Sequence, residues 1–249
     1  MNRHLAVVVM AAGKGTRMKN PDIAKVMYAV DGKPMIQHVV DLALALGSDR
    51  TVAIVGWQKE SVIAQLAGAG SGVECVEQSP QLGTGHAVMQ SERALAGFRG
   101  DVLVLSGDVP LLTRATASSL IEHHRTTGAA ATVLTAILDD PSGYGRVLRG
   151  DGGDVVGIVE HKDATEEQRR IQEINSGIYV FDRERLFEGL AHITPHNAQK
   201  EYYLTDVFHY FWRHGLAVQA LPSGDAREIM GVNTPEQLEE ARRAFAARS

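Results

Sequence analysis

The chain has 249 residues, 44% of them hydrophobic, and a formal net charge of −5. This composition provides no general basic surface, which argues against a nucleic-acid partner. No stretch of eighteen uninterrupted apolar residues occurs, so neither a membrane span nor a membrane partner is expected, and residues 1–12 lack the length and charge of a secretory signal. The single cysteine, Cys75, cannot form an internal disulfide, which favours a reducing, cytoplasmic compartment.

The first half of the chain alternates between predicted strands and predicted helices. The run from Leu5 to Met10 is rich in valine and lacks alternation, which predicts a strand buried on both faces. Apolar residues at helical spacing predict a helix that begins at Pro34 and ends at Gly47. Further strands are expected at residues 51–55, 73–76 and 101–105, and further helices at residues 61–66 and 86–95. This order predicts an α/β fold with a mainly parallel sheet.

The pattern changes after about residue 139. Turn-forming residues at 139–145 are followed by short strand-like runs at 146–148, 155–159 and 177–181, with a charged segment at 162–172 between them. These runs predict a smaller, more antiparallel layer against the sheet. A last helix is expected from Pro235 to about Ala246, and no linker divides the chain, so residues 1–249 are predicted to form a single domain.

The loop after the first predicted strand is a candidate phosphate site. Gly13 and Gly15 allow close approach of the backbone to an anion, and Lys14 and Arg17 add positive charge. Val8 and Gly15 exclude a P-loop, and Met18 excludes the dinucleotide-binding fingerprint. An ordinary strand-to-helix turn with a solvated Lys and Arg explains the loop equally well.

Asp108 and Asn233 are candidate metal ligands. Asp108 follows a predicted buried strand, where α/β sites form, and its carboxylate is a hard oxygen ligand for Mg²⁺; Gly107 beside it is expected to leave room for substrate. Asn233 precedes the last helix and can complete the metal shell with its amide oxygen. Alternatively, Asp108 caps a turn, and either Asn233 or Thr234 caps the helix, which for that segment alone is the favoured interpretation. The sequence contains no cluster of cysteines and histidines, so a zinc site is not indicated.

Two further groups suit recognition of a base and of a sugar. Gln78, Gly83 and Thr84 can read the edge of a planar base, although Thr84 as a helix cap is the alternative, and His86 is interpreted as a packing residue rather than a catalytic base. A second group supplies donors and acceptors that suit a sugar ring, and only the fold can bring its members together: Gly145, Glu160, Asn175, Tyr203 and Thr205. Residues 161–163 can instead be an exposed charged corner.

Taken together, these segments are similar to the uridyltransferase part of the bacterial N-acetylglucosamine-1-phosphate uridyltransferases. The similarity covers nearly the whole chain, in order: MAAGKGTRM, Lys25, QLGTGHA, GDVPL, DDPSGYGRV, IVEHKDAT, IQEINSGIYV, EYYLTDV and GVN. The segments AAGKGTRM and GDVPL also occur in other sugar-nucleotide transferases, whereas EHKDAT, QEINSGIY and EYYLTD are more particular to the N-acetylglucosamine group.

The resemblance implies a Rossmann-like nucleotidyltransferase fold and a magnesium-dependent enzyme. Residues 1–138 would mainly bind nucleotide, residues 139–230 mainly sugar, and residues 231–249 would supply the metal-ligand Asn and the last helix. The implied reaction joins UTP and N-acetylglucosamine-1-phosphate into UDP-N-acetylglucosamine and pyrophosphate, a step of cell wall and peptidoglycan synthesis. A transferase for another sugar-1-phosphate or NTP, and a non-catalytic sugar-nucleotide-binding regulator, are the alternatives.

The resemblance also assigns roles to individual residues. The nucleotide would be wrapped by Met10, Ala11, Ala12 and Gly13, its phosphates held by Arg17 and Lys25, and its uracil recognised by Gln78, Gly83 and Thr84. Asp108 and Asn233 would hold Mg²⁺, with Arg17, Lys25 and Asp108 as the catalytic residues and Ser106 and Gly107 beside the substrate. The N-acetylglucosamine part would be bound by Gly145, Glu160 and Asn175, with Tyr203 and Thr205 near it.

Four features depart from the family pattern. Met10 replaces a usual Leu, and Ser106 replaces a common Tyr, which alters contacts beside the metal. Ala24 replaces the usual Pro before Lys25, which predicts a looser phosphate loop. The chain ends at Ser249 without hexapeptide repeats, so the family's β-helix acetyltransferase part and the trimer it forms are not expected.

Overall fold

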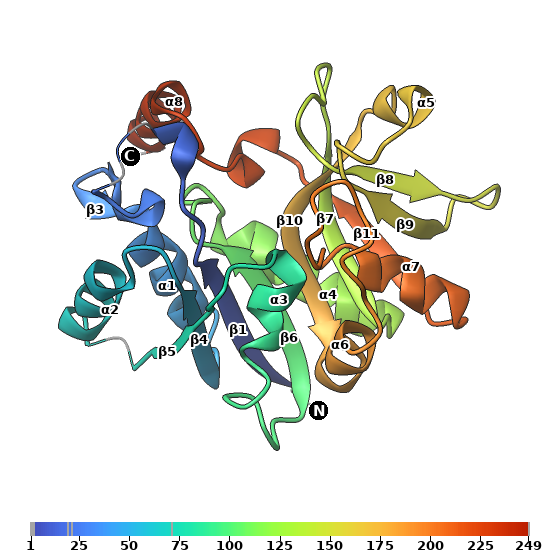
Figure 1. Cartoon of the computed structure of the whole chain (residues 1–249), viewed down its shortest axis with the longest axis horizontal. Helices are drawn as coiled ribbons and strands as arrows, with labels where there is room; N and C mark the ends of the chain where they lie inside the picture. The colour runs from blue at the N-terminus through green and yellow to red at the C-terminus, as the bar shows by residue number, and fades with distance from the viewer. Residues whose placement is uncertain (1–2, 19, 21, 71, 249) are drawn as a thin grey trace.

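A large mixed sheet forms the centre of the computed structural model, which describes residues 3–18, 20, 22–70 and 72–248. The sheet has nine strands in the order β11-β7-β10-β6-β1-β4-β5, with β8 paired to β10 and β9 paired to β8 (Figure 1). Its strands are β1 (His4–Ala11), β4 (Arg50–Val55), β5 (Glu74–Glu77), β6 (Gly100–Ser106), β7 (Ala131–Ile137), β8 (Arg146–Arg149), β9 (Val155–Val159), β10 (Glu173–Asp182) and β11 (Val218–Pro222). A separate two-stranded ribbon consists of β2 (Ala29–Val30) and β3 (Lys33–Pro34).

Helices cover both faces of this sheet. They are α1 (Met35–Ala45), α2 (Lys59–Gly68), α3 (Thr84–Met89), α4 (Arg114–Thr127), α5 (Glu166–Arg169), α6 (Arg183–Leu190), α7 (Asp206–Arg213) and α8 (Pro235–Ala246). On β1, Val7 and Val9 pack with α1, α2 and α4, whereas Ala6 and Val8 face the cluster that contains α3, α6 and α7. The prediction of a strand buried on both faces is therefore confirmed. Of the helices in these described ranges, none combines the length and the apolarity that crossing a bilayer requires.

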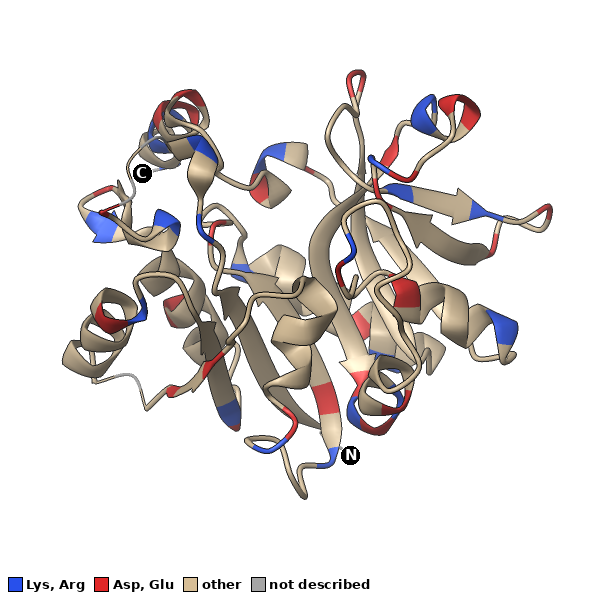
Figure 2. Ribbon diagram, in the orientation of Figure 1, with Lys and Arg blue, Asp and Glu red and all other residues tan. Residues whose placement is uncertain are grey.

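The predicted α/β class is confirmed, and β1, β4, β5 and β6 pair in parallel as expected. The smaller antiparallel layer is the β8–β9 hairpin, which joins the main sheet where Ile174 of β10 pairs with Arg146. Strand β10 itself lies within the main sheet, antiparallel to β6 and β7. Figure 2 shows charges of both signs spread over the helices and loops around a sheet that carries few of them.

Some predicted boundaries were wrong. The helix expected at 86–95 ends at Met89, because the amides of Gln90, Ser91 and Glu92 bond to carbonyls three residues earlier and tighten the chain into turns. Strand β10 begins four residues before the expected 177, at Glu173. Several elements had no counterpart in the sequence prediction: α4, β7, α6, α7 and β11.

Strand directions bring separate segments to one edge of the sheet. Met10 of β1 lies beside Ser106 of the parallel strand β6, so the loops after both strands start at the same place. Strand β10 runs the other way, with Tyr179 opposite Val104, so its beginning near Asn175 reaches this edge as well. The edge where the parallel strands end therefore collects the candidate site residues, as in other open α/β sheets.

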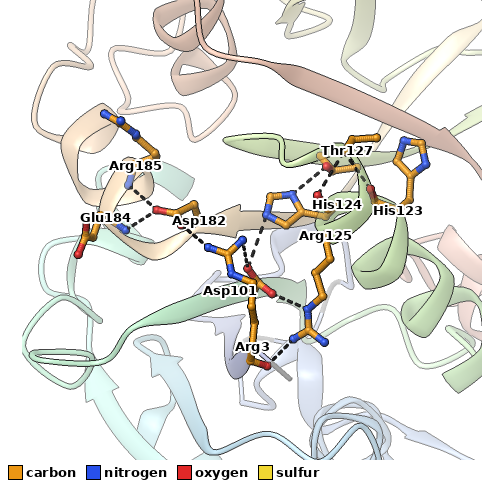
Figure 3. Close-up of polar contacts among 10 residues, drawn as sticks. Arg3, Asp101, His123, His124, Arg125, Thr127, Asp182, Glu184 and Arg185 are labelled. Carbon is orange, nitrogen blue, oxygen red and sulfur yellow. Dashed lines mark hydrogen bonds and ion pairs between the residues drawn. The ribbon is translucent and has the colours of Figure 1, made fainter. Parts of the chain in front are cut away.

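The opposite edge of the sheet is held by an ionic cluster around the buried carboxylate of Asp101 (Figure 3). Asp101 and Asp182 are paired neighbours on β6 and β10, and the Arg3 guanidinium contacts both carboxylates, at 3.3 and 2.8 Å. Arg125 of α4 donates to Asp101 at 2.6 Å, and His124 Nε2 lies 3.8 Å from the same carboxylate. The cluster therefore ties the start of β1 to α4 and to the end of β10.

Replacing His124 with Gln is expected to reduce the acid sensitivity of the fold. Burial disfavours the charged imidazole and lowers the pKa of His124 to about 4, whereas an unfolded histidine titrates near 6.5. Between these values the unfolded chain binds more protons, so the free energy of unfolding falls as the pH is lowered, by about 2–3 kcal/mol from pH 7 to pH 4.5. Denaturant titrations at these two pH values measure the free energy of unfolding. Its loss between pH 7 and pH 4.5 should be smaller by this amount in His124→Gln than in the wild type. The exposed control His196→Gln should behave as the wild type; equal losses in all three proteins would contradict the assignment.

Candidate functional site

A cleft of about 490 Å³ opens at the edge where the parallel strands end, a size that suits a small-molecule ligand. The predicted site residues that line it are Met10, Ala11, Ala12, Gly13, Lys25, Gln78, Gly83, Thr84, Ser106 and Asp108. Lys14, Gln81 and Glu201 line it as well. The structure thus brings the predicted nucleotide-binding residues together around one hollow.

The glycine-rich loop forms one wall of this cleft. A Cβ added at Gly13 would meet no atom within 4 Å, so this stretch of backbone is open to a ligand. Gly15 has φ +60°, and a Cβ there would lie 2.6 Å from the Cβ of Lys25. Only glycine therefore lets Lys25 pack this close to the loop. Met18 anchors the far end of the loop in a cluster with Val30 and Leu238. Arg17 lies on an exposed turn, outside the residues that line the cleft.

Lys25 connects the two candidate metal ligands. It begins a short 3-10 turn (Lys25–Met27), and its Nζ donates to Asp108 Oδ2 and, at 2.9 Å, to Asn233 Oδ1. Ala24 is buried with φ −57°, close to the value that proline would impose, so the turn forms with alanine in this position. The looser loop expected from Ala24 stays a prediction.

Asp108 and Asn233 are held in place by the backbone around them. The amide of Val232 donates to the carbonyl of Asp108 at 2.9 Å, which joins the segment before α8 to the loop after β6. The side-chain nitrogen of Asn233 donates to Gly231 O at 3.1 Å, so the amide oxygen is the atom that faces Lys25. Thr234, not Asn233, caps α8, so Asn233 can bond to Lys25, although Asn233 is not among the residues that line the cleft.

Gln237 also positions Asn233, and the sequence did not single it out. The side-chain Oε1 of Gln237 accepts a hydrogen bond from the backbone amide of Asn233 at 2.8 Å. The backbone amide of Gln237 donates to the hydroxyl of Thr234 at 3.3 Å. Thr and Gln at this spacing resemble a capping box, a signal that the sequence does contain. In a capping box the Gln side chain would accept the amide of the cap residue, Thr234, whereas here Gln237 accepts the amide of Asn233, one residue earlier.

The segment expected to recognise a base closes another side of the cleft. The amide nitrogen of Gln78 donates to Gly83 O at 2.9 Å and lies 3.1 Å from His86 Nδ1, so Gln78 braces the loop as well as lining the cleft. The alternative of Thr84 as a helix cap is wrong: Gly83 is the cap residue, and the hydroxyl of Thr84 accepts the amide of Leu204 at 3.0 Å. Burial lowers the pKa of His86, in keeping with a packing role.

Gly107 does not provide room for a substrate, contrary to the expectation from the sequence. A Cβ there would lie 3.0 Å from Ile36 Cδ1 and 3.2 Å from Met10 O, so the protein itself fills the space. Its amide donates to Met10 O at 2.9 Å, which continues the β1–β6 pairing past the strand ends. The missing side chain therefore serves close packing under the cleft.

Four of the five predicted sugar-binding residues lie together beside the cleft. Thr205 donates to Glu160 Oε1 at 3.0 Å, the amide of Asn175 donates to Gly145 O at 2.9 Å, and a Cβ at Gly145 would lie 3.3 Å from Glu160 Oε2. Burial, opposed by the hydrogen bond from Thr205, raises the pKa of Glu160. This group contributes no residue to the lining of the cleft itself.

Tyr203 is turned toward a different partner. Its hydroxyl donates to Asp163 Oδ2 at 3.1 Å, and burial together with that carboxylate raises the pKa of Tyr203. Asp163 also accepts the amide of Ala198 at 2.8 Å. Asp163 is exposed, but these two bonds make it a tie between the corner after β9 and the loop before α7, rather than only a solvated charge.

Gly177, whose amide bonds to Asn175, brings the sugar group close to Ser106 of the cleft. Asn175 Oδ1 accepts the amide of Gly177 at 3.0 Å, and a Cβ at Gly177 would lie 3.5 Å from the hydroxyl of Ser106. Tyr144 lies in the same region: burial and the charge of Asp108 raise its pKa, and the charge of Arg17 opposes them. A ligand with a nucleotide part in the cleft would therefore reach the sugar group past Ser106.

The comparisons with known proteins agree with this architecture. Residues 6–245 match the family described as Nucleotidyl transferase. The chain is 50% identical over 236 residues to the bifunctional protein GlmU of Geobacillus thermodenitrificans, covering 95% of this chain and 50% of that protein. It is 49% identical over 246 residues to GlmU of Exiguobacterium sibiricum, covering 99% and 54%. The chain thus spans about half the length of these curated relatives.

The same fold occurs in solved structures. A UDP-glucose pyrophosphorylase complexed with UDP-glucose superimposes with a TM-score of 0.78 at 19% identity, covering 99% of this chain and 100% of that one. An apo UDP-glucose pyrophosphorylase gives a TM-score of 0.79 at 20% identity, covering 98% and 99%. The family match over nearly the whole chain and the site at the strand ends lead to one conclusion: this chain belongs to the nucleotidyl transferase family.

Proposed function

We propose that this chain transfers the uridylyl group of UTP to N-acetylglucosamine-1-phosphate, giving UDP-N-acetylglucosamine and pyrophosphate. The observation that carries the proposal is the single ammonium of Lys25 held between Asp108 and Asn233 at a cleft lined by the glycine-rich loop. The sugar is inferred from the group around Glu160 and from the 50% identity to GlmU. The product would then supply peptidoglycan synthesis in the cytoplasm.

Members of this family typically use a divalent metal, and the residues present here suit Mg²⁺. Asp108 Oδ2 and Asn233 Oδ1 both face one cationic group, the Lys25 ammonium, so they already converge on a position that a cation can occupy. A carboxylate and an amide carbonyl are hard oxygen donors of the kind that Mg²⁺ prefers. When bound, Mg²⁺ would neutralise phosphate charge and help to orient the triphosphate.

The protein's task in such a reaction is mainly electrostatic. The attacking phosphate oxygen of the sugar is already an anion, so no general base is needed, but it must approach the anionic α-phosphate of UTP. Lys25 and Lys14 line the cleft and would offset this repulsion, with Arg17 at its exposed margin. The open backbone at Gly13 would let phosphate oxygens come close.

The remaining predicted residues would orient the two substrates. Gln78, Gly83 and Thr84 would contact uracil at one end of the cleft. Beside the cleft, Thr205 holds the Glu160 carboxylate, which would accept hydrogen bonds from the sugar. Asn175 and Gly145 would complete that contact, and Tyr203, bound to Asp163, would lie near it.

A panel of substrates tests the assignment. Pyrophosphate release should be fastest with UTP and N-acetylglucosamine-1-phosphate in the presence of Mg²⁺, and slower with glucose-1-phosphate, galactose-1-phosphate or glucosamine-1-phosphate and with ATP, CTP or GTP. Preference for another sugar or nucleotide would overturn the specific claim. Tight binding of UDP-N-acetylglucosamine without any turnover would instead indicate a regulator.

Replacing Lys25 with Ala is expected to lower kcat by roughly 30- to 1,000-fold, because losing one preorganised charge at the reacting phosphates costs about 2–4 kcal/mol in the transition state. Steady-state kinetics measure this effect, and far-UV circular dichroism checks the fold. The matched control is Lys33→Ala, because Lys33 is exposed and pairs with Asp41 on the surface. An unchanged kcat in Lys25→Ala would remove Lys25 from the catalytic set.

Replacing Gln237 with Leu should raise the Mg²⁺ concentration needed for half-maximal activity by roughly tenfold, as expected for a residue that orients a metal ligand. The reason is that Asn233 loses the acceptor for its backbone amide. Gln237→Glu keeps an acceptor oxygen in that position, now from a carboxylate, and should retain the wild-type requirement or lower it. If the Leu variant shows the wild-type Mg²⁺ dependence, Gln237 does not position the ligand.

A further inference from the structure

Lys25 occupies the position between the two oxygens assigned to the metal. Its Nζ is within hydrogen-bond distance of Asp108 Oδ2 and 2.9 Å from Asn233 Oδ1. A Mg²⁺ ion bound to both oxygens would need metal–oxygen distances of about 2.0–2.1 Å, which leaves no space for the ammonium between them. The metal and the ammonium therefore compete for one place.

The charges at this position make the competition strong. Asp108 supplies one negative charge, Asn233 is neutral, and the Lys25 ammonium balances the carboxylate. The side chains of Lys25 and Asp108 are only 16% and 12% exposed, so solvent screens them incompletely. A divalent ion that approached with Lys25 in place would meet a positive charge instead of a free carboxylate. The metal site is accordingly closed while the ammonium stays there.

The surroundings of Lys25 provide a second place for its ammonium. The backbone is fixed, since Ala24 and Val26 on either side are 1% and 5% exposed and Gly15 packs against the Lys25 side chain near its base. The four-carbon stem above that point is flexible, and it lines the same cleft as Gly13 and Lys14. Phosphate groups bound along the glycine-rich loop would attract the ammonium away from Asp108.

We propose that Lys25 acts as a resident counter-cation that blocks the metal site until a triphosphate draws it away. The inference rests on the proposed function and adds a coupling between its two ligands. Binding of the nucleotide increases the affinity for the metal, because the nucleotide draws away the ammonium that competes with the metal. The same lysine then contributes its charge to the phosphates, so one side chain serves the free and the bound states in turn.

Mn²⁺ binding to the nucleotide-free protein, followed by electron paramagnetic resonance, tests this inference. Lys25→Met keeps the length of the side chain and removes its charge, and it should bind Mn²⁺ at least roughly tenfold more tightly than the wild type, since the competing cation is gone. Lys25→Gln should also bind Mn²⁺ more tightly, which covers the case in which the Met variant does not fold. Asp108→Asn in the Lys25→Met background should abolish the added affinity.

The matched control is Lys14→Met, which removes one positive charge from the same cleft. Lys14 is directed to the ring of Trp57, with its Nζ 5.4 Å from the ring centroid, so it does not compete directly. This substitution should change the Mn²⁺ affinity by less than roughly threefold, because solvent and salt screen a charge that does not contact the metal site. An equal gain in Lys14→Met and Lys25→Met would indicate general charge repulsion and overturn the inference.

Other outcomes are equally decisive. Unchanged or weaker Mn²⁺ binding in both Lys25 variants would show that the ammonium does not block the metal, and added affinity that survives Asp108→Asn would show that the ion binds elsewhere; each overturns the inference. These results leave the substrate panel untouched. Conversely, competition between Lys25 and Mn²⁺ without uridylyl transfer would sink the proposed function and leave the competition standing.

Discussion

The parallel pairing of β1 with β6 is the constraint on which the functional region depends. It sets Met10 beside Ser106, so the glycine-rich loop and the loop that carries Asp108 leave the sheet at the same point. Both strands are buried on both faces, and a slip of one residue would move every side chain to the wrong face. The amide of Gly107 bonds to Met10 O and extends this pairing into the loops. The wall of the cleft is therefore built before any ligand arrives.

Long-range contacts complete what this pairing begins. Lys25 and Asn233 are 208 residues apart, yet their side chains meet at 2.9 Å because Val232 bonds to the backbone of Asp108. At the other edge of the sheet, Arg3 and Arg125 converge on Asp101, which fixes the start of β1 against α4. The two ends of the central strands thus differ in character. At one end, partly exposed arginines pair with the buried Asp101, and at the other end polar groups of the loops line the cleft with the glycine-rich loop.

The sequence predicted the parts of the fold in which local chemistry decides the structure. Valine-rich runs identified β1 and β6, and Pro235 marked the start of α8. The candidate position of Asp108 followed from its place after a buried strand. Helix α4 was not predicted, although its buried residues Ala117, Leu120, Ile121 and His124 recur at helical spacing in the sequence.

Other features depend on contacts that sequence spacing does not encode. Three such contacts follow from the tertiary arrangement: Gly107 packs against Ile36, Thr84 bonds to the amide of Leu204, and Gln237 bonds to the amide of Asn233. The grouping of Gly145, Glu160, Asn175 and Thr205 depends on the antiparallel direction of β10, which no local pattern announced. The division of the chain into nucleotide-binding and sugar-binding parts stays a prediction.

The reversed direction of β10 has a consequence for how such an enzyme can diversify. The residues proposed to bind the nucleotide lie on loops that follow parallel strands, whereas those proposed to bind the sugar lie at the beginning of β10, beside the β8–β9 hairpin and before α7. The hairpin pairs with β10, which separates it from β6 and β1, so a change in the turn between β8 and β9 leaves the β1–β6 pairing in place. Under the proposed function, substitutions in this outer part of the sheet would alter the choice of acceptor while the residues around β1 and β6 kept their arrangement.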